Sequence, residues 1–363
     1  MENKITLDLG ENSYDILVGS KKIDFLPNFL GKNKYSKIFI ITDENVASLH
    51  LSRLEAVLSQ FKLEKIVIKS GENSKSFAVL EQVCEEILAK NIDRKSLILA
   101  FGGGVVGDLA GFAASILLRG IDFVQIPTTL LAAVDSSVGG KTAINARAGK
   151  NLIGSFYQPK LVICDTDFLA TLPKREIRAG YAEILKYGLI FDREFFDFLD
   201  QNYENIFAIN QNYIEKIILK SCEVKAKIVS LDEKEQGLRA LLNFGHTFGH
   251  CFEGELNYDN RLNHGEAVGI GMLMAAKMSK NLGFLPENDY KIILQHITKT
   301  SLNIDLKAIE NNWSKQNLAS HLYKDKKTEN GKLTFILLEA IGNGFVKKDI
   351  EIGEFMKVID DFV

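Results

Sequence analysis

The chain has 363 residues, of which 46% are hydrophobic and 25% charged, with a formal net charge of −3. This length predicts two domains, and the small negative charge argues against a nucleic acid as the main partner. No apolar run approaches the roughly 18 residues of a membrane span, the N-terminus lacks the pattern of a signal peptide, and four scattered cysteines without a C-x-x-C pair are typical of a cytoplasmic protein.

The first half of the chain alternates strands with helices. Alternating apolar residues on either side of residues 10–13 predict a β-hairpin. Strands are then predicted at 37–42, 64–69, 96–101, 121–126 and 161–164, with helices at 46–61 and 76–90. This alternation indicates a doubly wound, mainly parallel, Rossmann-like α/β sheet. Ligands of such sheets bind beyond the carboxyl ends of the strands, where the loops 43–45, 70–75 and 102–108 fall.

After Pro173 the pattern becomes mainly helical. Helices are predicted at 176–189, 212–230, 242–253, 264–281 and 289–297, and a late apolar run at 333–341 is compatible with a strand. We therefore predict an α/β N-terminal domain over residues 1–172 and a mainly α-helical C-terminal domain over 173–363. With no long linker, we expect the active site in a cleft between the two domains.

A glycine-rich turn follows the predicted strand 96–101. Gly102, Gly104 and Gly107 fit G-x-G-x-x-G, and such a turn presents backbone N–H groups to a phosphate. Glycines also gather in turns for steric reasons alone, but a strand before and a helix after favour dinucleotide binding. Because this strand is the third after the predicted hairpin, Asp43, which follows the first of these strands at 37–42, is the better candidate for a ribose contact. Asp108 is also compatible with a simple acid near a helix N-terminus.

Three of the six histidines, His246, His250 and His264, lie within 19 residues. His246 and His250 are spaced i, i+4, so spacing alone predicts that both bind one metal ion. Glu183, among small and apolar neighbours, is a candidate carboxylate ligand. An ordinary hydrogen-bonded pair is the alternative for H-x-x-x-H. The other three histidines are predicted to be bystanders: His50, His296 and His321.

Several basic residues lie in apolar or glycine-rich surroundings. Together they would suit an anionic substrate with phosphate or carboxylate groups, although solvated surface charge is the alternative for each of them. They are Arg119, Lys141, Lys150, Lys186, Lys225 and Arg239. Asn151 and Asn243 would add neutral hydrogen bonds.

Six long segments, in the right order, resemble the 3-dehydroquinate synthase family. They are GGGVVGDLAGFAAS, LRGIDFVQIPTTLLAAVDSSVGGKTAIN, KNLIGSFYQP, AGYAEILKYGLI, LRALLNFGHTFGH and LNHGEAVGIGM, and the resemblance runs from about residue 41 to about residue 338. It implies a carbon–oxygen lyase of the shikimate pathway, which leads to chorismate and the aromatic amino acids. The implied reaction converts 3-deoxy-D-arabino-heptulosonate 7-phosphate to 3-dehydroquinate and phosphate.

The resemblance also implies a mechanism without net redox change. NAD+ oxidises the C5 hydroxyl to a ketone, which acidifies the C6 proton, and phosphate leaves by β-elimination with the substrate's own phosphate as base. The ketone is reduced again, the ring opens, and an intramolecular aldol reaction closes the carbocycle. NAD+, one Zn2+ or Co2+ ion and a cytoplasmic homodimer are implied as well.

The family's site residues can be transferred onto the matching positions. Glu183, His246 and His264 then resemble the metal ligands, which replaces the pair expected from spacing. The residues that resemble substrate contacts are Lys141, Asn151 and His250 for the phosphate, Arg119 from a neighbouring subunit, Lys225 and Arg239 for the carboxylate, Asp135, Lys186 and Asn243 for the reacting hydroxyls, and Lys326 or Lys327 as a late lysine that closes over the substrate. The residues that resemble NAD contacts are Asp43, Asn45, Glu72, Lys75, Gly103, Gly104, Val105, Asp108, Thr128, Thr129, Lys150, Phe168 and Thr171.

Two departures and three alternatives accompany this interpretation. Ser70 stands where the family often has Asp, and Ala133 replaces a commonly bulkier or polar residue. The nearest alternative is another sugar-phosphate cyclase, of the 2-deoxy-scyllo-inosose synthase or valiolone type, whose substrate lacks the carboxylate. A metal-dependent glycerol or alcohol dehydrogenase would not need the cationic set, and a non-catalytic NAD-binding protein would not need three metal ligands.

Overall fold

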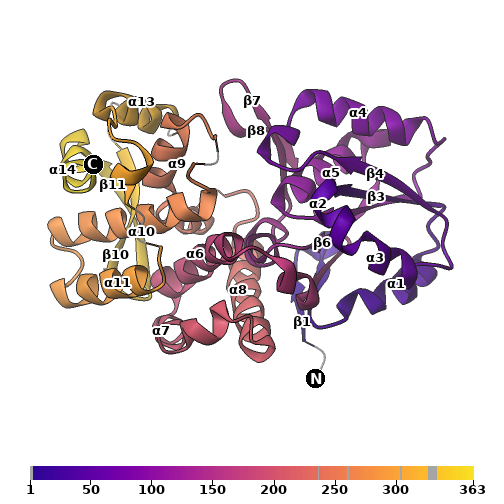
Figure 1. Ribbon diagram of the computed structural model, residues 1–363, viewed down its shortest axis with the longest axis horizontal. Helices are drawn as coiled ribbons and strands as arrows, with labels where there is room; N and C mark the ends of the chain where they lie inside the picture. The colour runs from indigo at the N-terminus through magenta and orange to yellow at the C-terminus, as the bar shows by residue number, and fades with distance from the viewer. Residues whose placement is uncertain (1–2, 236, 260, 303–304, 326–332) are drawn as a thin grey trace. The chain divides into compact units, whose positions relative to one another are not determined.

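The computed structural model describes residues 3–235, 237–259, 261–302, 305–325 and 333–363 (Figure 1). The chain divides into two compact units: residues 1–173 with 209–234 form the first, and residues 174–208 with 235–363 form the second. Among the described residues, none of the helices combines the length and apolar character needed to span a bilayer.

The first unit is built on a seven-stranded sheet. Its strands, in spatial order, are β1 (Lys4–Leu7), β2 (Tyr14–Gly19), β9 (Leu161–Asp165), β6 (Asp122–Pro127), β5 (Ser96–Gly102), β3 (Lys37–Asp43) and β4 (Leu63–Ile68). Only β1 and β2 pair antiparallel, and every other neighbouring pair is parallel. The predicted hairpin and the mainly parallel sheet are therefore confirmed.

Helices cover both faces of this sheet. They are α1 (Leu26–Asn33), α2 (Glu44–Val46), α3 (Ser52–Val57), α4 (Phe77–Leu88), α5 (Gly104–Ile116) and α8 (Gln211–Leu231). Side chains of one strand alternate between two apolar clusters: Phe39 packs with the residues of α4 and α5, and Ile40 packs with those of α1 and α3. All seven residues of β5 are buried, as expected for a central strand that is covered on both faces.

Two elements of the first unit lie outside the predicted pattern. Helix α8 packs against β1 and β2, so residues 209–234 belong to this unit although they follow the predicted boundary at residue 172. The second is the hairpin of β7 (Lys141–Ala146) and β8 (Gly149–Phe156), which packs on α5. Its strands approach so closely that a Cβ on Gly154 would lie 2.0 Å from the carbonyl oxygen of Thr142.

The second unit is mainly helical, as predicted. Its helices are α6 (Lys174–Phe191), α7 (Arg193–Phe207), α9 (His246–Glu255), α10 (His264–Asn281), α11 (Glu287–Lys299), α12 (Leu306–Ile309), α13 (Lys315–Asp325) and α14 (Ile352–Phe362), and β10 (Leu333–Ala340) pairs antiparallel with β11 (Asn343–Ile350). The buried helix α10 is central, because it packs against α6, α9, α11, α14 and β10.

Glycines let α6, α9 and α10 approach one another backbone to backbone. A Cβ on Gly271 would lie 2.1 Å from the carbonyl oxygen of Gly245, and one on Gly265 would lie 2.2 Å from the Cα of Ala179. Real Cβ atoms do not come so close, so these glycines fix how near the three helices lie. The same helices carry Glu183, His246 and His264.

Gly271→Ala is expected to lower the free energy of unfolding by about 1–3 kcal/mol, because the added methyl group overpacks a backbone contact. Urea unfolding measures the difference. Gly353→Ala is the matched control, since a Cβ at that position meets nothing within 4 Å. Equal stability of the Gly271→Ala variant and the wild type would show that these helices can separate at no cost.

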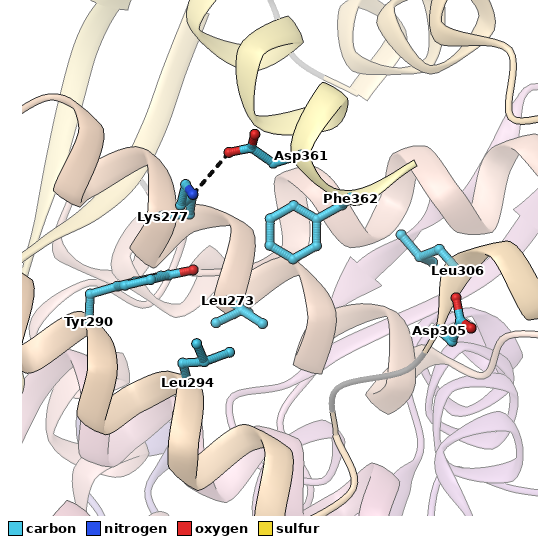
Figure 2. A pocket seen from close by; sticks show the side chains of 8 residues that line it. All are labelled: Leu273, Lys277, Tyr290, Leu294, Asp305, Leu306, Asp361 and Phe362. Carbon is cyan, nitrogen blue, oxygen red and sulfur yellow. Dashed lines mark ion pairs between the residues drawn. The ribbon is translucent and has the colours of Figure 1, made fainter.

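A hollow of about 380 Å³ opens in the second unit among α10, α11, α12 and α14 (Figure 2). Lys277 and Asp361 form an ion pair of 3.0 Å at this hollow. Its other lining residues are Leu273, Tyr290, Leu294, Asp305, Leu306 and Phe362. None of these is a predicted site residue. Leu273 and Lys277 follow His264 on α10 by roughly 14–20 Å along the helix axis.

Candidate active site

Three predicted metal ligands come together in the second unit. Glu183 is fully buried on α6, while His246 and His264 open α9 and α10. One ligand atom of each lies within 4.8 Å of the other two, and Glu183 Oε1 is 3.5 Å from His246 Nε2 and 3.4 Å from His264 Nε2. Two imidazoles and one carboxylate are a donor set of catalytic zinc sites, so these residues fit a divalent metal.

Local sequence signals start the helices at the two histidines. Gly245 has a φ of 83°, which ends the preceding 3₁₀ turn and changes the direction of the backbone, so that α9 begins at His246. Before α10, the Asn263 side chain accepts from the Glu266 N–H and Glu266 accepts from the Asn263 N–H, both at 2.9 Å. This capping box fixes His264 in the first turn of α10.

His250 lies in a second group of possible ligands, with Glu253 and His264. The rings of His246 and His250 are 5.4 Å apart and nearly perpendicular, at 89°. Neither of the two groups found among the described residues contains both histidines of the H-x-x-x-H pair. The i, i+4 spacing brings the rings near one another without turning their nitrogens toward one point.

The pKa values of the two histidines in the group of Glu183, His246 and His264 are shifted in opposite directions. Burial lowers the pKa of His246 to about 3, so its imidazole is neutral and can bind a metal. Burial also acts to lower the pKa of His264, but Glu253 and Glu183 outweigh it and raise this pKa to about 10. A divalent cation beside Glu183 would displace that proton, so metal binding should release protons.

Other predicted residues of the second unit lie on the same elements. Lys186 donates to Glu183 Oε2 one turn along α6, and both side chains are buried. Asn243 donates to Glu235 Oε1 at 2.8 Å, at the end of the short 3₁₀ helix that also carries the buried Arg239. Lys326 and Lys327 lie outside the described residues, so the choice between them stays a prediction.

In the first unit, most predicted NAD contacts lie along one edge of the sheet. They follow the carboxyl ends of five strands: Asp43 and Asn45 after β3, Glu72 and Lys75 after β4, Gly103, Gly104, Val105 and Asp108 after β5, Thr128 and Thr129 after β6, and Phe168 and Thr171 after β9. Lys150 lies on β8 instead. Helix α5 begins at Gly104, so its N-terminal N–H groups are available to an anion.

A polar network connects this edge to the β7–β8 hairpin. Lys75, 4% exposed, pairs with Asp108 at 2.6 Å and also donates to Asn151 Oδ1. Asn145 donates from its side chain to Glu72 Oε1 at 2.7 Å and from its backbone to the Lys75 carbonyl at 2.8 Å. It also accepts from the Asn151 N–H at 2.9 Å. Asp108 thus holds a lysine in addition to its place in the helix, and Asn145 is a network residue that sequence reasoning missed.

Asp135 and Lys225 are paired within the first unit. Lys225, on α8 and 5% exposed, donates to Asp135 Oδ1 at 2.8 Å and to the Asp135 carbonyl at 2.5 Å. Two residues for which separate substrate contacts were predicted therefore contact each other. Arg239, the predicted second member of the carboxylate clamp, belongs to the second unit.

Two family models match consecutive parts of the chain. The 3-dehydroquinate synthase N-terminal model covers residues 65–179, and the C-terminal model covers residues 180–328. The chain belongs to the 3-dehydroquinate synthase family. It is 47% identical to a 3-dehydroquinate synthase of Caulobacter vibrioides, over 97% of this chain and 96% of that one. It is also 47% identical to one of Bartonella quintana, over 95% and 94% of the two chains.

Solved structures of related cyclases share the fold. A 2-deoxy-scyllo-inosose synthase complexed with carbaglucose-6-phosphate, NAD+ and Co2+ matches with a TM-score of 0.89 and 25% identity, over 99% of this chain and 100% of that one. A 2-epi-5-epi-valiolone synthase from Streptomyces hygroscopicus with NAD+ and Zn2+ matches with a TM-score of 0.86 and 28% identity, over 98% of each chain. A glycerol dehydrogenase from Schizosaccharomyces pombe, with a TM-score of 0.67 and 17% identity over 96% of this chain and 88% of that one, shows the fold alone.

Two further positions from the sequence analysis, Arg119 and Ser70, lie in the first unit. Arg119 is exposed, and its side chain has no ion pair or hydrogen bond within the part of the chain that the structure describes. Leu118 and Arg119 have φ values of 50° and 68°, which cost about 1–2 kcal/mol per residue for side chains other than glycine. Ser70, the departure from the family's Asp, donates to Glu44 Oε1 at 3.3 Å.

His296, predicted to be a bystander, is a buried member of another network. Its Nδ1 is 2.7 Å from Asp200 Oδ1 and its Nε2 is 2.9 Å from the Tyr181 hydroxyl. Lys299 pairs with the same Asp200 at 2.8 Å. This network ties α11 to α6 and α7, and α6 carries Glu183.

Burial lowers the pKa of His296 from 6.5 to about 4. Because the unfolded chain then binds the proton more readily, the free energy of unfolding should fall as the pH drops from about 6.5 to about 4. Urea unfolding at several pH values tests this, with His296→Gln as the comparison, since that variant should lose this part of the pH dependence. Identical pH dependence of the two proteins would contradict the assignment.

Proposed function

We propose that this chain converts 3-deoxy-D-arabino-heptulosonate 7-phosphate to 3-dehydroquinate and phosphate, as a carbon–oxygen lyase. One observation carries the proposal: the Glu183, His246 and His264 group lies in a chain that is 47% identical to 3-dehydroquinate synthases over nearly its whole length. All four cysteines are free thiols, which supports a reducing, cytoplasmic location.

The proposed cofactors are NAD+ and one Zn2+ or Co2+ ion. Related cyclases of 25–28% identity have been solved with NAD+ and one of these two metals. When bound, NAD+ supplies a reversible hydride acceptor and the metal a Lewis acid for the substrate's oxygens. In this chain the residues at the strand ends of the first unit would hold the nucleotide, and Glu183, His246 and His264 would hold the metal.

The remaining predicted residues would bind and orient the substrate. Lys141, Asn151 and His250 would hold the phosphate and stabilise its charge as the C–O bond breaks. Lys225 and Arg239 would bind the carboxylate, and the Lys225–Asp135 pair places that ammonium group before the substrate arrives. Asp135, Lys186 and Asn243 would position the hydroxyls at the reacting carbon.

Phosphate release distinguishes this proposal from the other cyclases. We expect rapid release with the heptulosonate phosphate, and no release above background with glucose 6-phosphate or sedoheptulose 7-phosphate, which lack the carboxylate. Turnover of either of these two in place of the heptulosonate phosphate would refute the proposal.

We further propose that the enzyme is a homodimer in which Arg119 acts on the partner's substrate. Its exposed side chain, without a partner among the described residues, and the costly backbone at Leu118 and Arg119 support this role. Arg119→Ala and His264→Ala should each be nearly inactive alone. Mixed and allowed to exchange subunits, they should regain activity, because each mixed dimer has one site with both groups.

The activity of the mixture should approach about a quarter of the wild-type value for statistical exchange, since half of the dimers then carry one complete site. The control is the Arg119→Ala variant alone, taken through the same exchange procedure. Absence of recovery in a mixture shown to exchange subunits would contradict action across the dimer.

A further inference from the structure

The two groups of possible metal ligands share one residue, His264. Its Nε2 lies 3.4 Å from Glu183 Oε1, and its Nδ1 lies 3.2 Å from Glu253 Oε2. Glu253 is 1% exposed, as deeply buried as Glu183. The two ring nitrogens of His264 therefore face two different buried carboxylates.

The imidazole of His264 can direct only one of its two nitrogens at a given metal ion. Only the carboxylate beside that nitrogen can therefore bind the same ion as His264. A neutral imidazole has one N–H and one lone pair, so its two nitrogens have opposite roles. A carboxylate that accepts the N–H fixes the tautomer and the ring orientation, and makes the other nitrogen a better ligand. Since Nε2 faces Glu183 and lies in the same group as His246, Nδ1 is the nitrogen left to donate.

We propose that Glu253 is the positioning residue of the metal site: it accepts the Nδ1–H of His264 and so directs Nε2 at the metal, without binding the metal itself. This inference rests on the proposed metal site of Glu183, His246 and His264. On this assignment the group of His250, Glu253 and His264 is not a second metal site, because Glu253 supports the ligand His264 of the first site. Each chain should therefore bind one metal ion.

The helices place Glu253 for this role. Glu253 follows His246 by seven residues, or about two turns, so both lie on the same face of α9. That face packs on α10, where a Cβ on Gly249 would lie 2.8 Å from the carbonyl oxygen of Ala267. The close contact holds the carboxylate of α9 at a fixed distance from the first turn of α10, which carries His264.

The alternative is a second ion bound by His250, Glu253 and His264. Such an ion would use His264 Nδ1 while Nε2 binds the first, so the ring would have to lose both protons. The two cations would also lie close together, on either side of the single imidazole of His264. The count of bound ions separates the two cases.

Zinc affinity tests the proposal without any measurement of turnover. Zinc-loaded protein is titrated with a chromophoric chelator, and zinc per chain and the dissociation constant are determined for the wild type, Glu253→Gln and Glu253→Ala. We expect one zinc per chain in all three. Affinity should fall about 10- to 100-fold in Glu253→Ala. It should fall less in Glu253→Gln, because the amide oxygen still accepts the Nδ1–H but lacks the negative charge.

Glu255→Ala is the matched control. Glu255 lies on the same helix and pairs with His321 at 3.3 Å, a histidine outside the metal group, so its loss should leave zinc affinity unchanged. Wild-type affinity in both Glu253 variants would overturn the proposal, as would two zinc ions in the wild type and one in Glu253→Ala. If the alanine variant does not fold, wild-type affinity in Glu253→Gln alone overturns it. A wild type that binds no zinc would instead refute the metal site of the proposed function.

Discussion

His264→Ala is expected to lose nearly all bound zinc and all measurable turnover. The variant keeps Glu183 and His246, but two protein ligands rarely hold a catalytic metal ion. The buried Glu183 carboxylate would also lose one of the two imidazoles that lie within 3.5 Å of it. Zinc content after gel filtration and phosphate release from the heptulosonate phosphate measure the two effects.

His321→Ala is the control for the loss of a histidine from the same unit, since His321 pairs with Glu255 outside the metal group. It should retain full zinc and turnover. Unchanged zinc stoichiometry in His264→Ala would remove His264 from the ligand set, and the inference about Glu253 would fall with it.

Arg239→Ala is expected to weaken substrate binding by about 2–5 kcal/mol, as is found when one partner of a buried charge pair is removed. Arg239 is 2% exposed, so its charge acts away from water. NAD+ binding should change little, because the predicted nucleotide residues lie in the first unit. Titrations of the two ligands give the comparison directly.

Arg193→Ala is the matched control, because the Arg193 side chain forms an exposed ion pair with Asp197 and such pairs contribute little to stability. Urea unfolding of both variants separates loss of fold from loss of binding. Equal losses of substrate and NAD+ affinity in a folded Arg239→Ala variant would count against the carboxylate clamp.

Local signals predicted the first unit well. Strand β5 is an uninterrupted apolar run that ends in glycines, and its neighbours β3 and β6 have the same character, so the parallel sheet follows from short stretches of sequence. The hairpin of β7 and β8 gave no such signal, because its residues are largely exposed or only partly buried and its close pairing depends on Gly154.

Features that depend on tertiary contacts could not be predicted from local sequence patterns. Helix α8 has an ordinary helical pattern, and only its packing on β1 and β2 places it in the first unit. The spacing of His246 and His250 suggested a shared ion, whereas the structure groups His246 with Glu183, which lies far earlier in the chain. Asn145 and Glu253 were missed because their importance lies in contacts with residues on other elements.

One assay tests the central claim, that this chain eliminates phosphate through a transient oxidation. Phosphate release and the absorbance of NADH are followed together, with the heptulosonate phosphate in excess over NAD+. We predict that phosphate release continues far beyond one turnover per NAD+, that no NADH accumulates, and that chelation stops the reaction until zinc is restored. NADH that accumulates in step with product, or phosphate release that persists in protein freed of NAD+, would contradict the account.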